Sequence, residues 1–155
     1  MYFEDFSEYQ YLSSQPLPRV RNIGWIGPEA PFTVGDTSDE FRLKLVDIFL
    51  RRGEFDVEVN LCRGEGYVCH LCGAKDVMLE MGDKRRILGA SEIWLPGKNG
   101  IYFAAPSLVI HYIFMHNYSP PAEYIQAVLD FDVTQAYSGK DARYELLSDL
   151  KFGKG

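Results

Sequence analysis

The sequence predicts an α+β fold, in which a small antiparallel β-meander packs on two to three helices around a zinc-finger-like unit. Three observations support this prediction. Segments with helical periodicity flank a central run of short, strand-like segments. Glycine and proline residues separate these segments at turn-length intervals. Two cysteines and two histidines have spacings that zinc ligands use, which predicts a knuckle and a helix joined by a metal.

The length of 155 residues predicts a single domain over residues 1–155, long enough to bury a core. We expect a finger-like core at about residues 62–118, preceded by a strand and helix segment (1–61) and followed by C-terminal helices (119–155). Apolar residues make up 46% of the chain and aromatic residues 14%, which excludes a disordered protein.

The N-terminal sequence and the net charge predict the cellular compartment and the class of partner. The chain starts MYFEDFSEYQ, without the basic region of a secretory signal, and no apolar run approaches the roughly 18 residues that span a bilayer. We therefore expect a cytoplasmic protein with no membrane partner and with reduced thiols. The net charge of −6 disfavours nucleic acid and favours a basic protein partner.

The N-terminal half is expected to hold short strands and one helix. Residues 1–36, rich in Pro, Gly and aromatic residues, predict short strands joined by turns. Thr37 and Glu40 have the spacing of a capping box, so a helix is expected to open here and to stop at Gly53. Alternating apolar and polar residues predict a half-buried strand at 55–59.

The central and C-terminal parts continue this pattern. Short strands are expected at 77–81, 87–88, 92–95 and 101–104. The basic residues Lys84, Arg85 and Arg86 are expected at a solvated hairpin tip. A largely buried helix is expected at 107–117 after Pro106, and a second one after Pro121, with Ser119 as its N-cap. A turn at 138–139 and a short helix at 144–150 complete the chain.

The candidate metal ligands are Cys69, Cys72, His111 and His116. The chain has only three cysteines and three histidines, and four of these six residues form a Cys-x2-Cys pair and a His-x4-His pair. Gly73 permits a tight turn after the cysteines. Five positions on a regular helix separate two side chains by about 140°, so the helix must tighten or end near His116. The gap between Cys72 and His111 exceeds the usual finger spacing of about 12 to 15 residues.

Two other interpretations of these residues stay open. The cysteines can be small buried residues and the histidines satisfied core residues, although an unpartnered imidazole in the apolar helix would be costly. A redox Cys-x2-Cys pair requires a strand-to-helix context that the sequence lacks. Four protein ligands complete a tetrahedral shell, so a zinc ion here is expected to be structural rather than catalytic.

Weaker chemical signals have simpler explanations. Cys62 and His70 could act as nucleophile and base, but no glycine-rich elbow accompanies them, and residues 63–66 fit a loop better than a phosphate-binding site. Glu92 fits either a tuned carboxylate or the solvent face of a strand. Four N-terminal aromatic residues can either close the core or form a partner surface: Tyr9, Tyr11, Trp25 and Phe32.

Residues 63–128 resemble a family of small bacterial proteins without an established activity. The shared pattern comprises Arg63-Gly64, Tyr67, Cys69-x2-Cys72-Gly73, Leu88-Gly89, Glu92-Ile93, Tyr102-x-Ala-Ala-Pro106, His111-Tyr112 and His116-x-Tyr118-x-Pro-Pro-x-Glu123-Tyr-Ile. Such proteins usually have a His before the first Cys, where this sequence has Val68. The resemblance implies a bacterial zinc-binding domain in which that His is not an obligatory ligand, and it implies no catalytic residue.

The leading functional hypothesis is a non-enzymatic bacterial zinc-stabilised protein-binding domain, of the immunity or antitoxin type that neutralises a basic toxin. One alternative is a nucleic-acid-associated regulator that uses the finger-like unit, although the helix at 107–117 contains no Lys or Arg. Another alternative is an enzyme with its site in a cleft between the N-terminal segment and the finger-like unit.

Overall fold

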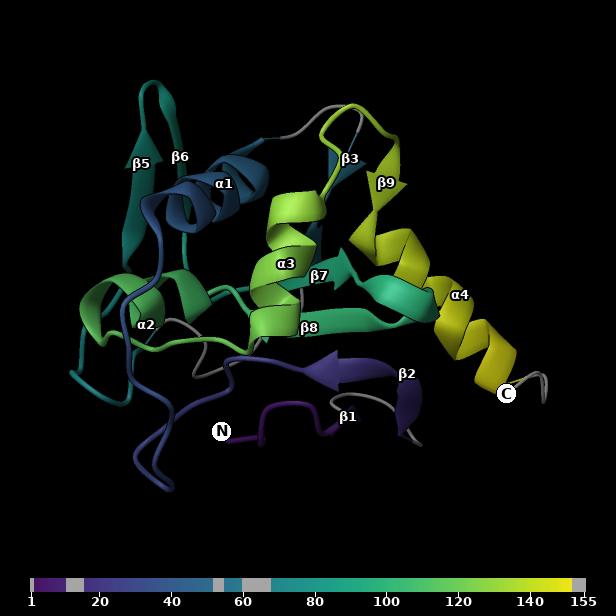
Figure 1. Ribbon diagram of the computed structural model, residues 1–155, viewed down its shortest axis with the longest axis horizontal. Coiled ribbons are helices and arrows are strands. Elements are labelled where there is room, and N and C mark those ends of the chain that lie inside the picture. The colour runs from purple at the N-terminus through teal and green to yellow at the C-terminus, as the bar shows by residue number, and fades with distance from the viewer. Residues whose placement is uncertain (1, 11–15, 52–54, 60–67, 152–155) are drawn as a thin grey trace.

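The computed structural model of the chain describes residues 2–10, 16–51, 55–59 and 68–151. Over these residues the protein is a mixed α/β structure with four α-helices and three small sheets (Figure 1). The α-helices are α1 (Asp39–Leu50), α2 (Val109–Met115), α3 (Ala122–Asp130) and α4 (Gly139–Lys151). The strands are β1 (Glu8–Tyr9), β2 (Leu17–Asn22), β3 (Phe55–Asp56), β4 (Glu58–Val59), β5 (Met78–Met81), β6 (Lys84–Ile87), β7 (Glu92–Pro96), β8 (Tyr102–Pro106) and β9 (Tyr137–Ser138). The predicted mixture of helices and strands is confirmed.

The largest sheet contains both parallel and antiparallel strand pairs, in the order β1-β2-β8-β7-β4. β8 is antiparallel to β7, with Ala104 opposite Trp94, but parallel to β2, with Tyr102 opposite Val20. The prediction of a single antiparallel meander is therefore wrong in its topology. Turn residues reveal only the pairing of neighbouring strands, whereas β2 and β8 are distant in sequence.

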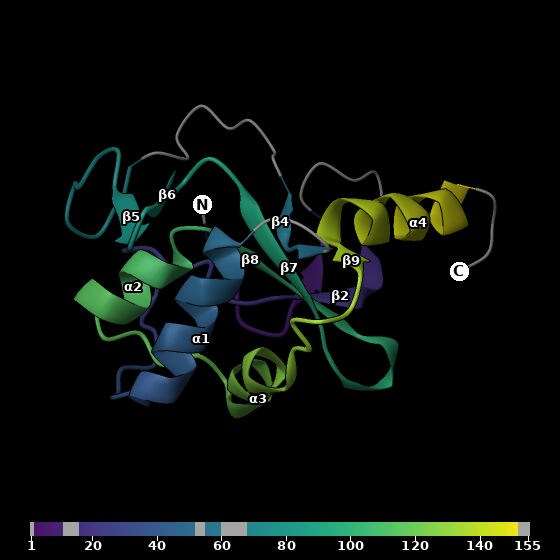
Figure 2. The same ribbon diagram turned by 90° about the horizontal axis from the view of Figure 1, so that it is seen from above.

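The hairpin of β5 and β6 is a separate two-stranded sheet, which both views place beside α1 and α2 (Figures 1 and 2). Lys84 and Arg85 are exposed, as predicted, but they lie on β6 rather than at the hairpin tip, which is Gly82-Asp83. Arg86 differs, because its side chain is only 8% exposed and its Nη1 lies 2.9 Å from Oε1 of the buried Glu58. Its guanidinium also lies over the ring of Phe49. The prediction of a solvated basic cluster is thus wrong for Arg86, which joins the hairpin to the body.

The main sheet separates two hydrophobic clusters. Ile93 and Leu95 on β7 belong to the larger cluster, together with residues of α1, α2 and α3. Trp94, between them in sequence, belongs to the smaller cluster, against which Leu146 and Leu147 of α4 pack. Figure 2 shows α4 on the opposite side of the sheet from the other three helices. The alternation along β7 follows the two-residue period of a strand.

The N-terminal aromatic residues lie mainly in the core. Tyr9 and Trp25 are buried in the smaller cluster, and Nε1 of Trp25 donates to the carbonyl oxygen of Ala104 at 2.9 Å. Phe32 is partly buried against the larger cluster. Tyr11 lies outside the described residues. For Tyr9 and Trp25, the structure favours a role in the core over a partner surface.

Helix α1 begins one residue later than the capping-box spacing indicated. Its N-cap is Ser38, whose Oγ accepts a hydrogen bond from the amide of Phe41 at 3.1 Å. The hydroxyl of Thr37 instead accepts from Nε of Arg42 at 2.7 Å. The helix ends at Leu50, before the expected stop at Gly53, which lies outside the described residues. The strand predicted at 55–59 is divided, because β3 pairs with β9 while β4 pairs with β7.

The boundaries of α3 and α4 differ from the predicted ones. Ser119 is not the N-cap of α3, since Pro121 occupies that position without a side-chain cap. α4 starts at Gly139, at the predicted turn, and is longer than the predicted 144–150 segment.

Gly24 has φ +74°, and a Cβ there would lie 2.5 Å from Cγ2 of Val109, so only glycine allows α2 to pack this closely. Among the described residues, no helix has both the length and the apolar character that a membrane crossing needs.

Candidate metal centre

Cys69, Cys72, His111 and His116 form one cluster, in which the four ligand atoms all lie within 4.8 Å of one another. The Sγ atom of Cys69 lies 3.5 Å from Nε2 of His116, and Sγ of Cys72 lies 3.5 Å from Nε2 of His111. The fold therefore brings together the four residues singled out by their spacing. They are close enough to bind one metal ion.

A tight turn presents the two thiols. Val68 and Lys75 pair as an isolated antiparallel bridge, and the amide of Gly73 donates to the carbonyl oxygen of Cys69 at 2.7 Å. Gly73 has φ +77°, a conformation that glycine adopts without steric cost. The chain can therefore reverse direction immediately after Cys72, so that both thiols lie on one side of the turn.

The C-terminal end of α2 presents the two imidazoles. His111 lies inside the helix, whereas His116 is its C-cap, with φ −116° and ψ 6°. This departure from helical geometry offsets the divergence of about 140° that five positions on a regular helix would produce. The two ring centroids lie 5.1 Å apart. Asn117, with φ +55°, then directs the chain away. The prediction that the helix ends near His116 is confirmed.

The cluster has a buried side and an open side. Cys69 is fully buried and His111 is 7% exposed, whereas Cys72 is exposed and His116 is half-buried. Burial raises the pKa of the Cys69 thiol, while burial and the nearby His116 lower the pKa of His111. Both shifts favour the uncharged forms. A thiolate at Cys69 therefore needs a positive charge beside it, which a metal ion would supply.

The geometry weakens the two interpretations without a metal. If the cysteines were only small core residues, both should be buried. Cys72 is exposed, however, and its Sγ faces the imidazole of His111. A thioredoxin-like pair opens a helix, whereas the turn at residues 68–75 leads into β5. The convergence of both thiols on both imidazoles fits a ligand set better.

The other residues singled out from sequence do not extend the cluster. Cys62 and residues 63–66 lie outside the described residues. His70 is exposed and is not a member of the cluster, although it lies between the two cysteines in sequence. Glu92 is fully buried, so the interpretation as a solvent-facing strand residue is wrong. Its carboxylate accepts hydrogen bonds from Oη of Tyr9 and Nε1 of Trp94, on the side of the sheet that α4 covers.

Two residues near the cluster had not been singled out from sequence. Tyr112 is 6% exposed, and its pKa is raised by burial and by the neighbouring Cys69 and Cys72. Leu71 packs against the larger hydrophobic cluster and anchors the turn between the cysteines. In the sequence, Tyr112 stands out only as part of the shared family pattern beside His111, and the only signal for Leu71 is that it precedes Cys72.

Comparison with known families identifies the chain. Residues 1–129 match the family described as a domain of unknown function (DUF7919), and the chain belongs to this family. The match includes all four cluster residues and α1, α2 and nearly all of α3. No curated protein and no solved structure matches the chain.

Proposed function

We propose that this DUF7919 protein binds one structural zinc ion through Cys69, Cys72, His111 and His116. We further propose that the folded, zinc-stabilised domain is non-enzymatic and serves to bind another protein. The observation that supports the zinc site is the convergence of two thiols and two imidazoles within 4.8 Å. Thiolates and imidazoles in a tetrahedral set are typical ligands of zinc.

Two of the separations within the cluster match those around a tetrahedral ion. With metal–sulfur bonds of about 2.3 Å and metal–nitrogen bonds of about 2.0–2.1 Å, a tetrahedral site separates sulfur from nitrogen by about 3.5 Å. The two pairs of Sγ and Nε2 atoms lie at 3.5 Å each. Hydrogen-bonding contacts alone would not require both pairs to share one centre.

The same count of ligands supports a structural role. Four protein ligands fill a tetrahedral shell, whereas a catalytic zinc ion keeps a position for water or substrate. The proposed ion joins two segments that are far apart in sequence, the turn at residues 68–75 and the end of α2. Its binding free energy would therefore contribute to the stability of the fold.

Metal analysis of the purified protein tests the site. We expect one zinc ion per chain in the unaltered protein and substantially less in Cys72→Ser and His116→Ala, because each removes one ligand. His70→Ala is the matched control, since His70 is exposed, lies between the two cysteines and is outside the cluster. Absence of zinc from the unaltered protein, or equal zinc loss in His70→Ala, would contradict the site.

Two features support the proposed protein-binding role, which we propose to be of the immunity or antitoxin type. The net charge of −6 favours a basic partner through electrostatic steering. Beside the metal cluster, α2 exposes Phe114 (44%) and Met115 (69%), and β5 of the adjacent hairpin exposes Met78 (47%). Exposed Met and Phe side chains near each other are typical of protein-interaction surfaces. By contrast, α2 carries no Lys or Arg, which disfavours a role for this helix on nucleic acid.

Co-expression with the basic protein encoded by a neighbouring gene tests this role. We expect a complex whose affinity falls as salt rises and which Met115→Asp weakens by about tenfold, because a carboxylate would be buried in an apolar contact. Tyr144→Asp is the matched control, since Tyr144 is 71% exposed and belongs to α4, which lies away from α2 (Figure 1). Zinc content must be equal in both variants. No complex, or equal weakening by both changes, would contradict the role.

A further inference from the structure

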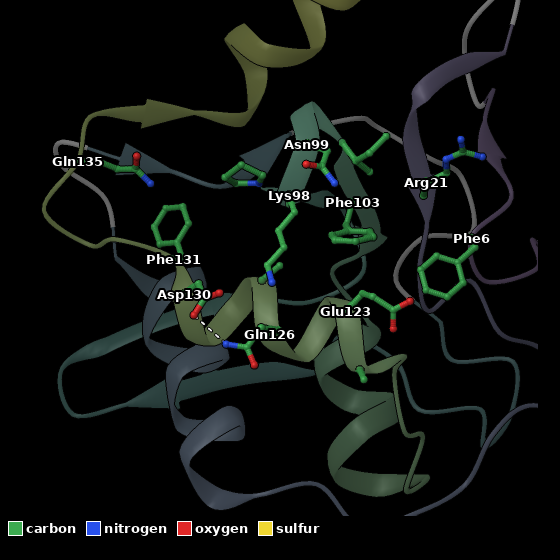
Figure 3. Close-up of a pocket in the computed structure, with 15 residues that line it drawn as sticks. Phe6, Arg21, Lys98, Asn99, Phe103, Glu123, Gln126, Asp130, Phe131 and Gln135 are labelled. Carbon is green, nitrogen blue, oxygen red and sulfur yellow. Dashed lines mark hydrogen bonds between the residues drawn. The ribbon is translucent and has the colours of Figure 1, made fainter.

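A pocket of about 820 Å³ lies away from the metal cluster, between α3 and the connection from β7 to β8 (Figure 3). The N-terminal segment closes one end through Phe6 and Arg21, and none of the four cluster residues lines the pocket. Its volume falls within the range of about 300–1,000 Å³ that is typical of small-molecule sites. The metal proposal and this pocket are therefore independent features of the protein.

Aromatic side chains form its opposite walls. Figure 3 shows Phe103, from β8, on one side and Phe131, which follows α3, on the other. Both rings are held from behind, Phe103 by a T-shaped contact with Tyr124 and Phe131 by one with Phe55. These contacts fix the two rings on their sides of the pocket.

The connection between β7 and β8 is shaped to keep the Phe103 wall in place. A Cβ at Gly97 would lie 2.7 Å from Cε2 of Phe103, so the absence of a side chain lets the ring pack against this backbone. The amide of Gly97 donates to the carbonyl oxygen of Ile101 at 2.7 Å, which closes the turn η1 (Lys98–Gly100). The turn thereby projects Lys98 from the rim of the pocket.

Lys98 is an exposed cation that makes no ion pair with any residue the structure describes. Figure 3 shows its side chain extending toward α3, with Phe103 and Phe131 on either side. Within the described part of the chain, neither Lys98 nor Arg21 has an ion-pair partner within 4.0 Å. Two carboxylates of α3 also line the pocket: Glu123 lies toward Phe6, and Asp130 accepts a hydrogen bond from Nε2 of Gln126 at 2.8 Å while keeping its negative charge.

We propose that this pocket binds a small aromatic anion, with its ring system between Phe103 and Phe131 and its anionic group at Lys98. The aromatic walls supply apolar burial and ring contacts. The ammonium group of Lys98 supplies a charge-assisted hydrogen bond, which is stronger than a neutral one. Glu123 and Asp130 both oppose the same anion by like-charge repulsion, and they thereby limit the affinity.

Titration of the zinc-loaded protein with 1-anilinonaphthalene-8-sulfonate, followed by its fluorescence, tests this proposal. We expect saturable binding of one molecule per chain. Lys98→Met should weaken it about tenfold, which corresponds to the loss of about 1.4 kcal/mol for one charge-assisted hydrogen bond. Glu123→Gln should strengthen it about two- to threefold. Ala122→Trp should abolish binding, because Ala122 is an exposed residue at the mouth.

Two controls separate this site from nonspecific binding. Lys140→Met, at an exposed lysine of α4 outside the pocket, should leave the affinity unchanged. In competition, 1-naphthoate should displace the dye, whereas the uncharged 1-naphthol should displace it at least tenfold less well. The proposal is overturned if binding is not saturable, if Lys98→Met and Lys140→Met act alike, or if the neutral competitor is as effective as the anion.

Discussion

Chelation of the proposed zinc ion is expected to lower the melting temperature of this protein by about 10 °C. A ligand that binds only the folded state, free at about 1,000 times its dissociation constant, stabilises that state by about 4 kcal/mol. In a domain of this size each kcal/mol changes the melting temperature by about 2–4 °C. Cys69 and His111 are buried against the larger hydrophobic cluster, so loss of the ion should loosen α2 as well as the turn at residues 68–75.

The comparison that isolates the metal is between the chelated protein and a ligand variant. Cys72→Ser should melt at the temperature of the chelated unaltered protein, and further chelator should not change it. His70→Ala should keep both the higher melting temperature and its sensitivity to chelator. Differential scanning calorimetry at fixed free zinc gives these values. A melting temperature that is independent of chelator in the unaltered protein would show that the ion does not stabilise the fold.

The cluster of Cys69, Cys72, His111 and His116 could be predicted because its signals are local. Cys-x2-Cys followed by Gly73 specifies a turn, and two histidines at the end of an apolar helix specify the other half of the site. Helix α1 was predictable for the same reason, since its apolar face and its capping hydroxyl lie within one segment. The observed N-cap is Ser38 rather than the predicted Thr37, which alters the helix boundary by one residue but not the existence of the helix.

The parts that could not be predicted depend on contacts between distant segments. Nothing local to β2 indicates that it lies parallel to β8, and this pairing replaces the expected meander. In the sequence, Arg86 is one of three similar basic residues. Only the fold shows that it forms a buried ion pair with Glu58, which lies on another strand. The aromatic pocket is likewise formed by the N-terminal segment, the turn after β7 and α3, none of which has a binding motif of its own.

Glu92, for which the sequence leaves both a tuned carboxylate and a solvent-facing position open, is buried and carries a large predicted effect. Its carboxylate is fully buried on β7 and accepts hydrogen bonds from Oη of Tyr9 at 3.1 Å and from Nε1 of Trp94 at 2.8 Å. Alternation along a strand would place residue 92 on the same face as Trp94, and α4 covers that face. A carboxylate enclosed in this way is retained only while its donors satisfy it.

Glu92→Ala is therefore expected to lower the free energy of unfolding by about 3 kcal/mol or more. The change leaves two buried donors without their acceptor, at about 1–3 kcal/mol each, and it opens a cavity beside Trp94. Tyr9→Phe removes one donor and should cost only about 1 kcal/mol. Glu80→Ala on β5 is the control, because the side chain of Glu80 is 61% exposed, and its loss should cost less than about 0.5 kcal/mol.

Urea denaturation followed by tryptophan fluorescence measures all three variants, since Trp94 is buried in the folded protein and becomes exposed on unfolding. We expect the midpoint to fall most for Glu92→Ala, with the slope of the transition unchanged. Equal stability of Glu92→Ala and Glu80→Ala would contradict the role of this carboxylate in the core. Because Glu92 lies on the sheet face opposite the larger cluster, zinc content should be the same in all three variants. The two large effects are therefore separable, one acting through the ion at α2 and the other through the hydrogen bonds beneath α4.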